Sequence, residues 1–223
     1  ATSELKQLLE ESFDRYCAQL SADITDEMAF PAYLRGNALS RYFFWRKLEY
    51  VIKAAALRPD TAVFDFGCGS GVLLPTLSDE GRVVWATDLH LGPAQYLTSA
   101  MKLSSVEFLD PDAWQKEIPD GRLDVIIAAN VLEHIEDRKS LLRILAQILK
   151  PDGRLVVSGP TEGELYRMGR RLIGFSGDYH VSTIYDILSD VRETGFRNVY
   201  QHKLPFIEPF CLYIIASFQS ANS

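Results

Sequence analysis

The chain has 223 residues, of which 47% are hydrophobic and 24% charged, and its formal net charge is −7. This length and composition suit one globular domain with a substantial core and a modest extension. The acidic balance argues against a nucleic-acid backbone as the main partner, because neutralising phosphates requires clustered Lys and Arg. Three cysteines are too few and oddly numbered for a disulfide framework.

No part of the sequence carries a signal for membrane insertion or secretion. The first residues lack the basic and apolar regions of a secretory signal. No stretch approaches the roughly 18 apolar residues that are needed to span a bilayer. We therefore expect no transmembrane segment and a cytoplasmic location.

Helical periodicity dominates the N-terminal quarter of the chain. Apolar residues from Leu5 onward recur at helical spacing, and a second helix is predicted between residues 39 and 55. Residues 21–37, which contain proline and glycine, form the expected linker between these helices. We expect residues 1–58 to form a helical cap or lid and residues 59–223 to form the main domain.

Strand and helix patterns alternate along the main domain. Strands are expected near residues 62–66, 83–87, 105–109, 123–129 and 153–158. Helices are expected near residues 71–79, 93–103, 113–117, 138–149 and 183–194. A last pair of strands, near 197–204 and 211–218, suits an antiparallel edge hairpin. The alternation requires right-handed crossovers and predicts an α/β fold with a doubly wound, Rossmann-like, seven-stranded and mostly parallel sheet.

The first predicted strand runs directly into a glycine-rich turn. Residues 63–71 read Val-Phe-Asp-Phe-Gly-Cys-Gly-Ser-Gly, and the second strand ends at Asp88. Glycines let the backbone approach a ligand where a Cβ would collide, and the acid can accept both hydroxyls of a ribose. The glycine spacing is not that of a dinucleotide fold or a P-loop. Asp65, two residues before the first glycine, suits a cofactor with an amino group rather than phosphates.

Five segments resemble the motifs of the class I S-adenosylmethionine-dependent methyltransferases, of the type 11-like kind. They are, in chain order, Asp65–Gly71, Asp88, Val106–Ala113, Asp124–His134 and Leu149–Leu155. The last departs from the family pattern at Asp152, which stands in place of a glycine. The resemblance covers roughly residues 60–218 and implies S-adenosyl-L-methionine as cofactor and S-adenosyl-L-homocysteine as product.

The resemblance also implies a set of cofactor contacts. They are Asp65, Gly67, Cys68, Gly69, Gly71, Asp88, Leu89, Asp112, Ala113 and Asn130. The glycine backbone would lie against the methionine moiety, and Asp65 with the carbonyl around Asn130 would face its ammonium group. Asp88 would hold the ribose. Asp112 and the Ala113 amide would face the adenine.

Three of these polar residues have a structural alternative. Asp88, Asp112 and Asn130 could each cap the helical turn that follows it. Asp110, two residues before Asp112, competes with it for the adenine contact. The sequence leaves these alternatives open.

Methyl transfer asks for few functional groups from the protein, because the sulfonium is an activated donor with a neutral leaving group. A general base is useful only if the acceptor must lose a proton. His180 and His134 are the candidate catalytic residues, both in predicted loops at the carboxyl ends of strands. His134 belongs to a motif turn that can be purely structural. His90 and His202 read as ordinary surface or edge-strand residues.

The acceptor site is expected between the second helix and a substrate-side insertion at residues 160–181. The predicted substrate contacts are Tyr42, Trp45, Tyr166, Arg167 and Arg170. Arginine forks suit a carboxylate or phosphate, and the apolar residues around them could line a pocket or lie on a membrane surface. Both elements have a structural alternative. The insertion could be a solvated helix that packs on the sheet, and the aromatic residues of the second helix could belong to the core.

Together these features predict a methyltransferase that acts on oxygen or nitrogen of a small-molecule acceptor, amphiphilic or acidic, as a monomer or homodimer. No metal ion is expected. An RNA or protein methyltransferase is the competing enzyme hypothesis, which the acidic balance and the lack of an Asn-Pro-Pro-Tyr-type motif after the fourth strand disfavour. A non-catalytic cofactor-binding scaffold would have no need of both the glycine turn and the acids.

Overall fold

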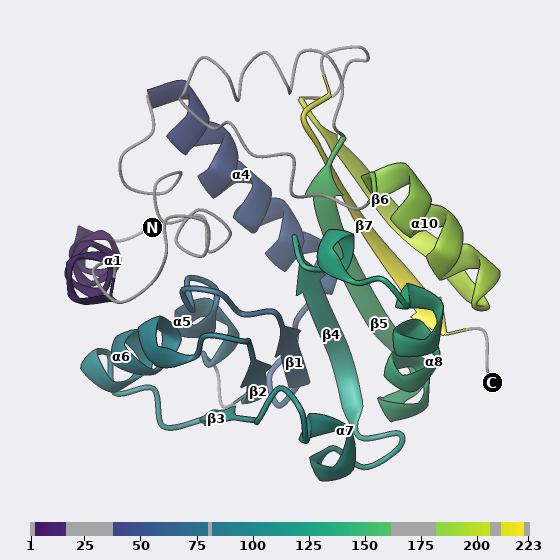
Figure 1. The fold of residues 1–223 in the computed structure, drawn as a ribbon, viewed down its shortest axis with the longest axis horizontal. Helices are drawn as coiled ribbons and strands as arrows, with labels where there is room; N and C mark the ends of the chain where they lie inside the picture. Colours follow the sequence, from purple (N-terminus) through teal and green to yellow (C-terminus); the bar gives the residue numbers. More distant parts are fainter. Residues whose placement is uncertain (1–2, 17–37, 80–81, 162–181, 206–210, 221–223) are drawn as a thin grey trace.

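The computed structural model describes residues 3–16, 38–79, 82–161, 182–205 and 211–220. Seven strands of this described part form one sheet in the order β3-β2-β1-β4-β5-β7-β6 (Figure 1). Their bounds are β1 Ala62–Phe66, β2 Val83–Thr87, β3 Val106–Phe108, β4 Leu123–Ala129, β5 Leu149–Pro160, β6 Phe196–Leu204 and β7 Tyr213–Ser220. The first five strands pair in parallel, and β7 runs antiparallel to both β5 and β6. The predicted fold class is confirmed.

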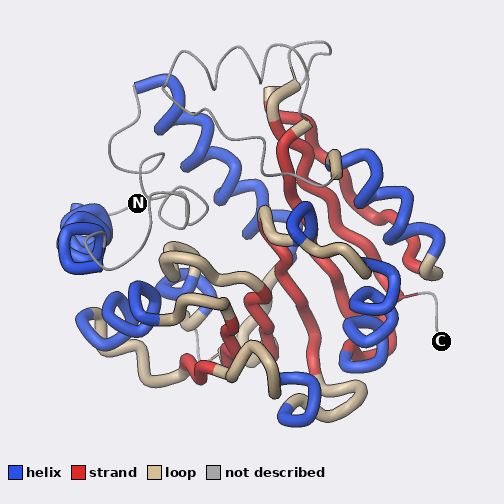
Figure 2. The backbone as a smooth tube through the Cα atoms, in the orientation of Figure 1, coloured by secondary structure: helices blue, strands red, loops and turns tan. Residues whose placement is uncertain are grey.

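Helices cover both faces of the sheet (Figures 1 and 2). One face carries α1 Ser3–Tyr16, α4 Ala38–Ala55, α5 Leu74–Leu77 and α6 Gly92–Ala100, and the other carries α7 Trp114–Glu117, α8 Arg138–Ile148 and α10 Ile184–Glu193. Neighbouring strand residues point to opposite faces. Val63 of β1 therefore packs in the core under α4, whereas Phe64 packs against Trp114 with ring centroids 5.3 Å apart.

Two predicted elements differ from the structure. The helix expected at 71–79 is reduced to α5, because Gly71 has a left-handed φ of 77° and the helix begins only beyond it. Strand β5 begins at Leu149 instead of residue 153 and includes a left-handed Asp152 with a φ of 63°. Asp is among the residues that tolerate this region, which explains how it can stand in place of the family's glycine.

The N-terminal helices share the core of the sheet. Leu9 of α1 and Val51 of α4 are fully buried in the same cluster as Val63 of β1. Helix α1 lies against α6, where Ser12 Oγ donates to the carbonyl oxygen of Pro93 at 3.4 Å. The proposed division into a cap of residues 1–58 and a main domain stays a prediction. No helix within the described residues is long and apolar enough to cross a membrane.

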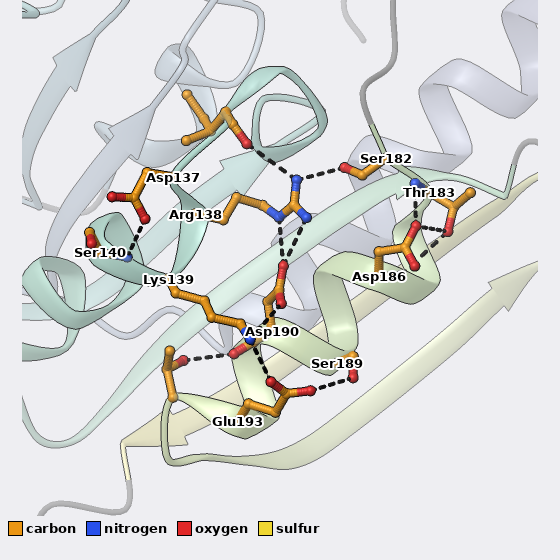
Figure 3. A network of polar contacts seen from close by, with 12 residues as sticks. Asp137, Arg138, Lys139, Ser140, Ser182, Thr183, Asp186, Ser189, Asp190 and Glu193 are labelled. Carbon is orange, nitrogen blue, oxygen red and sulfur yellow. Dashed lines mark hydrogen bonds and ion pairs between the residues drawn. The ribbon is translucent and has the colours of Figure 1, made fainter.

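A polar network holds the turn after β4 against α10 (Figure 3). Arg138 donates to Asp190 Oδ2 from Nε at 2.9 Å and from Nη2 at 2.8 Å. Its Nη1 donates to Ser182 Oγ at 2.7 Å and to the Ile135 carbonyl oxygen at 3.2 Å. The ion pair is mostly buried, so it constrains the turn that leads out of the carboxyl end of β4.

Candidate active site

The glycine turn is held in a backbone conformation that glycine adopts without strain. Gly67, Gly69 and Gly71 have φ angles of 79°, 54° and 77°. The amides of Gly67 and Cys68 donate to the carbonyl oxygen of Thr87 at 2.9 and 3.0 Å. The turn is therefore attached to the end of β2. Within the turn, burial raises the pKa of the Cys68 thiol well above its usual range. Cys68 is a reduced core residue here, as its place in the core cluster also indicates.

Two of these glycines are also required by close packing. A Cβ at Gly67 would lie 2.6 Å from Cγ2 of Val131, in the turn after β4. A Cβ at Gly71 would lie 3.0 Å from Cα and Cβ of Ala94, so Gly71 permits the approach of α6 to the turn. Packing alone accounts for Gly71, and its predicted contact with the methionine moiety stays a prediction.

Asp65, near the end of β1, is a buried carboxylate. Its side chain is 2% exposed, and its Oδ2 has no hydrogen-bond partner among the described residues. Burial, together with the nearby charge of Asp88, raises the pKa of Asp65 to about 7. A buried carboxylate without a partner is costly, and an ammonium group beside it would offset that cost. The site therefore fits a ligand that brings an amino group to the carboxyl end of β1.

Asp88 follows β2 and has a structural role of its own. Its Oδ2 accepts from the Gly69 amide at 2.7 Å and its Oδ1 from the His90 amide at 3.0 Å. It does not cap α6, whose N-cap residue is Leu91. Each carboxylate oxygen has a second lone pair, so the predicted ribose contact is compatible with these bonds. Leu89 beside it is 79% exposed, an apolar surface that suits its predicted place against the cofactor.

The predicted adenine contacts lie on the exposed turn after β3. The Asp112 amide donates to Asp110 Oδ1 at 2.7 Å, and the Ala113 amide donates to the Asp110 carbonyl oxygen at 3.1 Å. The side chain of Asp112 does not cap α7, whose N-cap is Ala113. Asp110 thus shapes the turn while the Asp112 carboxylate remains exposed. Since the Ala113 amide is engaged in this turn, its donation to adenine would be shared with Asp110.

Asn130 directly follows β4 and has a left-handed backbone, with a φ of 59°. Its amide donates to the Ser158 carbonyl oxygen at 2.9 Å. Its Oδ1 accepts from Lys47 Nζ at 2.9 Å and from Ser158 Oγ at 3.2 Å. It does not cap the short 3₁₀ helix η1 (Leu132–His134), whose N-cap is Val131. The Asn130 side chain is instead bound to α4 and β5.

Lys47 of α4 is a buried cation to which the sequence analysis assigns no role. It is 3% exposed, and its Nζ lies 4.8 Å from the Phe44 ring centroid and 5.1 Å from that of Tyr213. Burial lowers the pKa of Lys47 to about 8, and the negative charge of the buried Glu133 opposes that shift. A lysine on an otherwise apolar helix face was the available signal. The pattern of the helix does not indicate its distant partners, which are Asn130 after β4, Glu133 on η1 and Tyr213 on β7.

The other predicted acceptor-side residues within the described part of the chain lie on η1 and α4. His134 is half-buried at the end of η1 and Tyr42 is 55% exposed on α4. Trp45 packs against the core, and Lys6 Nζ of α1 lies 5.9 Å from its ring centroid. Trp45 therefore has a packing role, and its predicted contact with the acceptor stays a prediction, as does that of the exposed Tyr42. His202 lies on β6 and stacks on Tyr50 with ring centroids 3.6 Å apart.

Four of the predicted site residues lie outside the described residues. They are Tyr166, Arg167, Arg170 and His180. Their predicted roles stay predictions.

A family model described as a methyltransferase domain matches residues 39–201. This match extends from α4 through most of β6 and includes the glycine turn, Asp88 and Asn130. The chain belongs to the methyltransferase domain family. The predicted resemblance to the S-adenosylmethionine-dependent methyltransferases is confirmed, and with it the predicted cofactor at the level of the family.

Curated relatives of this chain include ubiquinone biosynthesis O-methyltransferases. The protein from Yersinia enterocolitica is 32% identical over 117 residues, which make up 50% of this chain and 48% of that protein. The protein from Escherichia coli O157:H7 (strain EC4115) is 30% identical over 119 residues, with the same coverage. The chain thus spans about half the length of the curated relatives it matches.

Solved structures show the same fold. The magnesium protoporphyrin IX methyltransferase from Synechocystis, a structure with bound S-adenosylhomocysteine, has a TM-score of 0.65 at 22% identity and covers 88% of this chain and 94% of its own. A methyltransferase from Aquifex aeolicus has a TM-score of 0.61 at 21% identity, with 76% and 88% covered.

Proposed function

We propose that the chain transfers a methyl group from S-adenosylmethionine to an oxygen or nitrogen atom of a small-molecule acceptor. The buried carboxylate of Asp65 carries this proposal. It lies beside a glycine turn, lacks a partner for Oδ2 among the described residues, and matches a ligand with an amino group rather than one with phosphates. When bound, S-adenosylmethionine supplies a methyl group on a sulfonium whose leaving group is neutral.

The residues of this chain would hold the cofactor at three points. Asp65 and the backbone of Asn130 would bind its amino group, Asp88 its ribose, and the turn around Asp112 its adenine. The protein then contributes orientation and the exclusion of water. Where the acceptor is a hydroxyl or an ammonium, His134 or His180 would take its proton.

The acceptor side of the proposal rests on the relatives and on α4. The relatives named above are O-methyltransferases by name, which favours an oxygen acceptor. The exposed ring of Tyr42 offers an aromatic surface to an amphiphilic or aromatic molecule. Arg167 and Arg170 are the proposed partners of an acidic group. We propose a monomer or homodimer in the cytoplasm as the working state.

Calorimetric titration tests the donor site first. We expect S-adenosylhomocysteine to bind in the micromolar range, at about −8 kcal/mol, and more tightly than NAD. Tighter binding of NAD would contradict the proposal. Incubation with methyl-labelled S-adenosylmethionine and a panel of phenols, carboxylic acids and amines then tests transfer, and binding without label transfer to any acceptor class would favour the scaffold hypothesis.

A further inference from the structure

Asn130 occupies a conformation that a side-chain-bearing residue adopts only when its surroundings stabilise it. A left-handed backbone costs a residue with a Cβ roughly 1–2 kcal/mol, although Asn tolerates it better than most. The conformation occurs where β4 ends, at the point where the chain turns into η1. It sets the direction of the Asn130 carbonyl, the group expected to face the amino group of the cofactor.

The contacts that hold Asn130 come from two other elements. Ser158 of β5 binds both the amide and the side chain of Asn130. Lys47 of α4 donates to Oδ1 at 2.9 Å. The backbone contact exists in any parallel pair of strands, whereas the two side-chain contacts fix the Asn130 side chain and with it the backbone to which it is attached.

Burying the charged side chain of Lys47 between α4 and the sheet costs free energy. Burial of an ammonium requires compensation, which here comes from Asn130, from the negative charge of Glu133 and from the faces of two aromatic rings. An apolar side chain of the same length would fill the space at lower cost. The ammonium group therefore has a purpose beyond packing, and within the described part of the chain it donates to the neutral Oδ1 of Asn130.

We propose that Lys47 is a positioning residue for cofactor binding, which acts through the Asn130 side chain to hold the Asn130 backbone left-handed. The inference rests on the proposed function, since it assumes that S-adenosylmethionine binds at the end of β4. Helix α4 thereby belongs to the donor site without touching the donor.

Glycine substitution separates this role from simple packing. Glycine adopts a left-handed φ without help, so Asn130→Gly should need no support from Lys47. We expect Lys47→Met, which keeps the buried stem and removes the ammonium, to raise the Kd of S-adenosylhomocysteine about tenfold, as loss of the backbone preference implies. In the double variant Lys47→Met/Asn130→Gly, the Kd should return to within about twofold of the Asn130→Gly value.

Asn130→Ala and Lys53→Met are the matched controls. Asn130→Ala keeps a Cβ and loses the side-chain bonds, so it should weaken binding where Asn130→Gly does not. Lys53→Met removes an exposed lysine from the last turn of the same helix and should leave the Kd unchanged. Thermal melts of every variant establish that it is folded. If Lys47→Met alone does not fold, the comparison of the double variant with Asn130→Gly decides, because equal affinity supports the proposal and weaker affinity overturns it.

An unchanged Kd in folded Lys47→Met overturns the inference, as does a weakened Kd that Asn130→Gly fails to restore. The second result would mean that Lys47 only packs α4. Failure of the unmodified chain to bind S-adenosylhomocysteine is a different result, which contradicts the proposed function itself.

Discussion

The carboxylate of Asp88 accepts a hydrogen bond from the Gly69 amide at 2.7 Å, so the acid that follows β2 braces the glycine turn that follows β1. The two motif residues follow the neighbouring strands β1 and β2, whose carboxyl ends meet at one edge of the sheet. A second bond, from the His90 amide, fixes the carboxylate on its other side. Asp88 is therefore both a structural brace and the proposed ribose ligand.

Asp88→Ala should consequently weaken two properties at once. Loss of hydrogen bonds to a charged acceptor costs about 1.5–3 kcal/mol each, so we expect S-adenosylhomocysteine affinity to fall by at least tenfold and the ligand-free chain to melt at a lower temperature. The Asp112 carboxylate is exposed, so Asp112→Ala should weaken the binding of S-adenosylhomocysteine without lowering the melting temperature. Calorimetry and thermal melts measure both effects. An unchanged affinity in folded Asp88→Ala would show that the ribose is held elsewhere.

Asp65→Asn should stabilise the ligand-free chain and abolish tight cofactor binding. The buried carboxylate has a pKa raised to about 7, so at pH 8 it is ionised at a cost that the neutral amide does not bear. We expect a higher melting temperature at pH 8 and a Kd for S-adenosylhomocysteine raised at least tenfold. A lower melting temperature together with retained binding would mean that Asp65 has a structural partner instead.

The same group predicts the pH dependence of stability. In the folded chain the pKa of Asp65 is about 7 against an ordinary value of 3.8, so between these values the folded state binds more protons than the unfolded state. The contribution of this group to stability is therefore greatest at low pH, and it falls as the pH rises toward 7. Urea unfolding of the unmodified chain and of Asp65→Asn at pH 5.5 and at pH 8 measures this contribution to the free energy of unfolding. An identical pH dependence in the variant would contradict a raised pKa of Asp65.

Cofactor binding should show the opposite trend. An amino group needs the ionised carboxylate, so the Kd of S-adenosylhomocysteine should rise by up to about tenfold for each pH unit below about 7. Asp65→Asn should bind weakly with little pH dependence in this range. Calorimetry at pH 5.5, 6.5 and 7.5 distinguishes the two, and an affinity of the unmodified chain that is constant over this range would count against Asp65 as the ammonium ligand.

Gly67→Ala and Gly121→Ala form a matched pair for the cost of a side chain in the glycine turn. Both positions have a left-handed φ, of 79° and 61°, but only the Cβ at residue 67 would collide, at 2.6 Å from Val131. We expect Gly121→Ala to lower the free energy of unfolding by about 1 kcal/mol and Gly67→Ala to lower it by more than about 3 kcal/mol, since rigid neighbours add overpacking strain. Equal losses in urea unfolding would show that Val131 moves aside freely.

The sequence by itself determined the parts of this protein that are encoded locally. Hydrophobic runs between glycine, proline and polar residues located the strands, and the alternation of strand and helix patterns required a parallel sheet. The spacing from Asp65 through the glycine turn to Asp88 selected the class of cofactor, because the chemistry of that turn depends on residues that are neighbours in the chain. The sequence also showed that Asp152 stands where the family has a glycine, whereas its left-handed backbone was found only in the structure.

Tertiary structure decided which side chains meet across the sheet. The bond between Lys47 and Asn130 joins residues 83 positions apart, and the periodicity of α4 indicates only that Lys47 lies on an apolar helix, not what lies beneath it. The same holds for Trp45, whose packing against the core follows from where α1 and α4 lie. The absence of a partner for Asp65 Oδ2 within the described residues likewise emerges only when every neighbouring element is in place. Local patterns specify elements, whereas burial and the pairing of charges depend on contacts between elements that are distant in the chain.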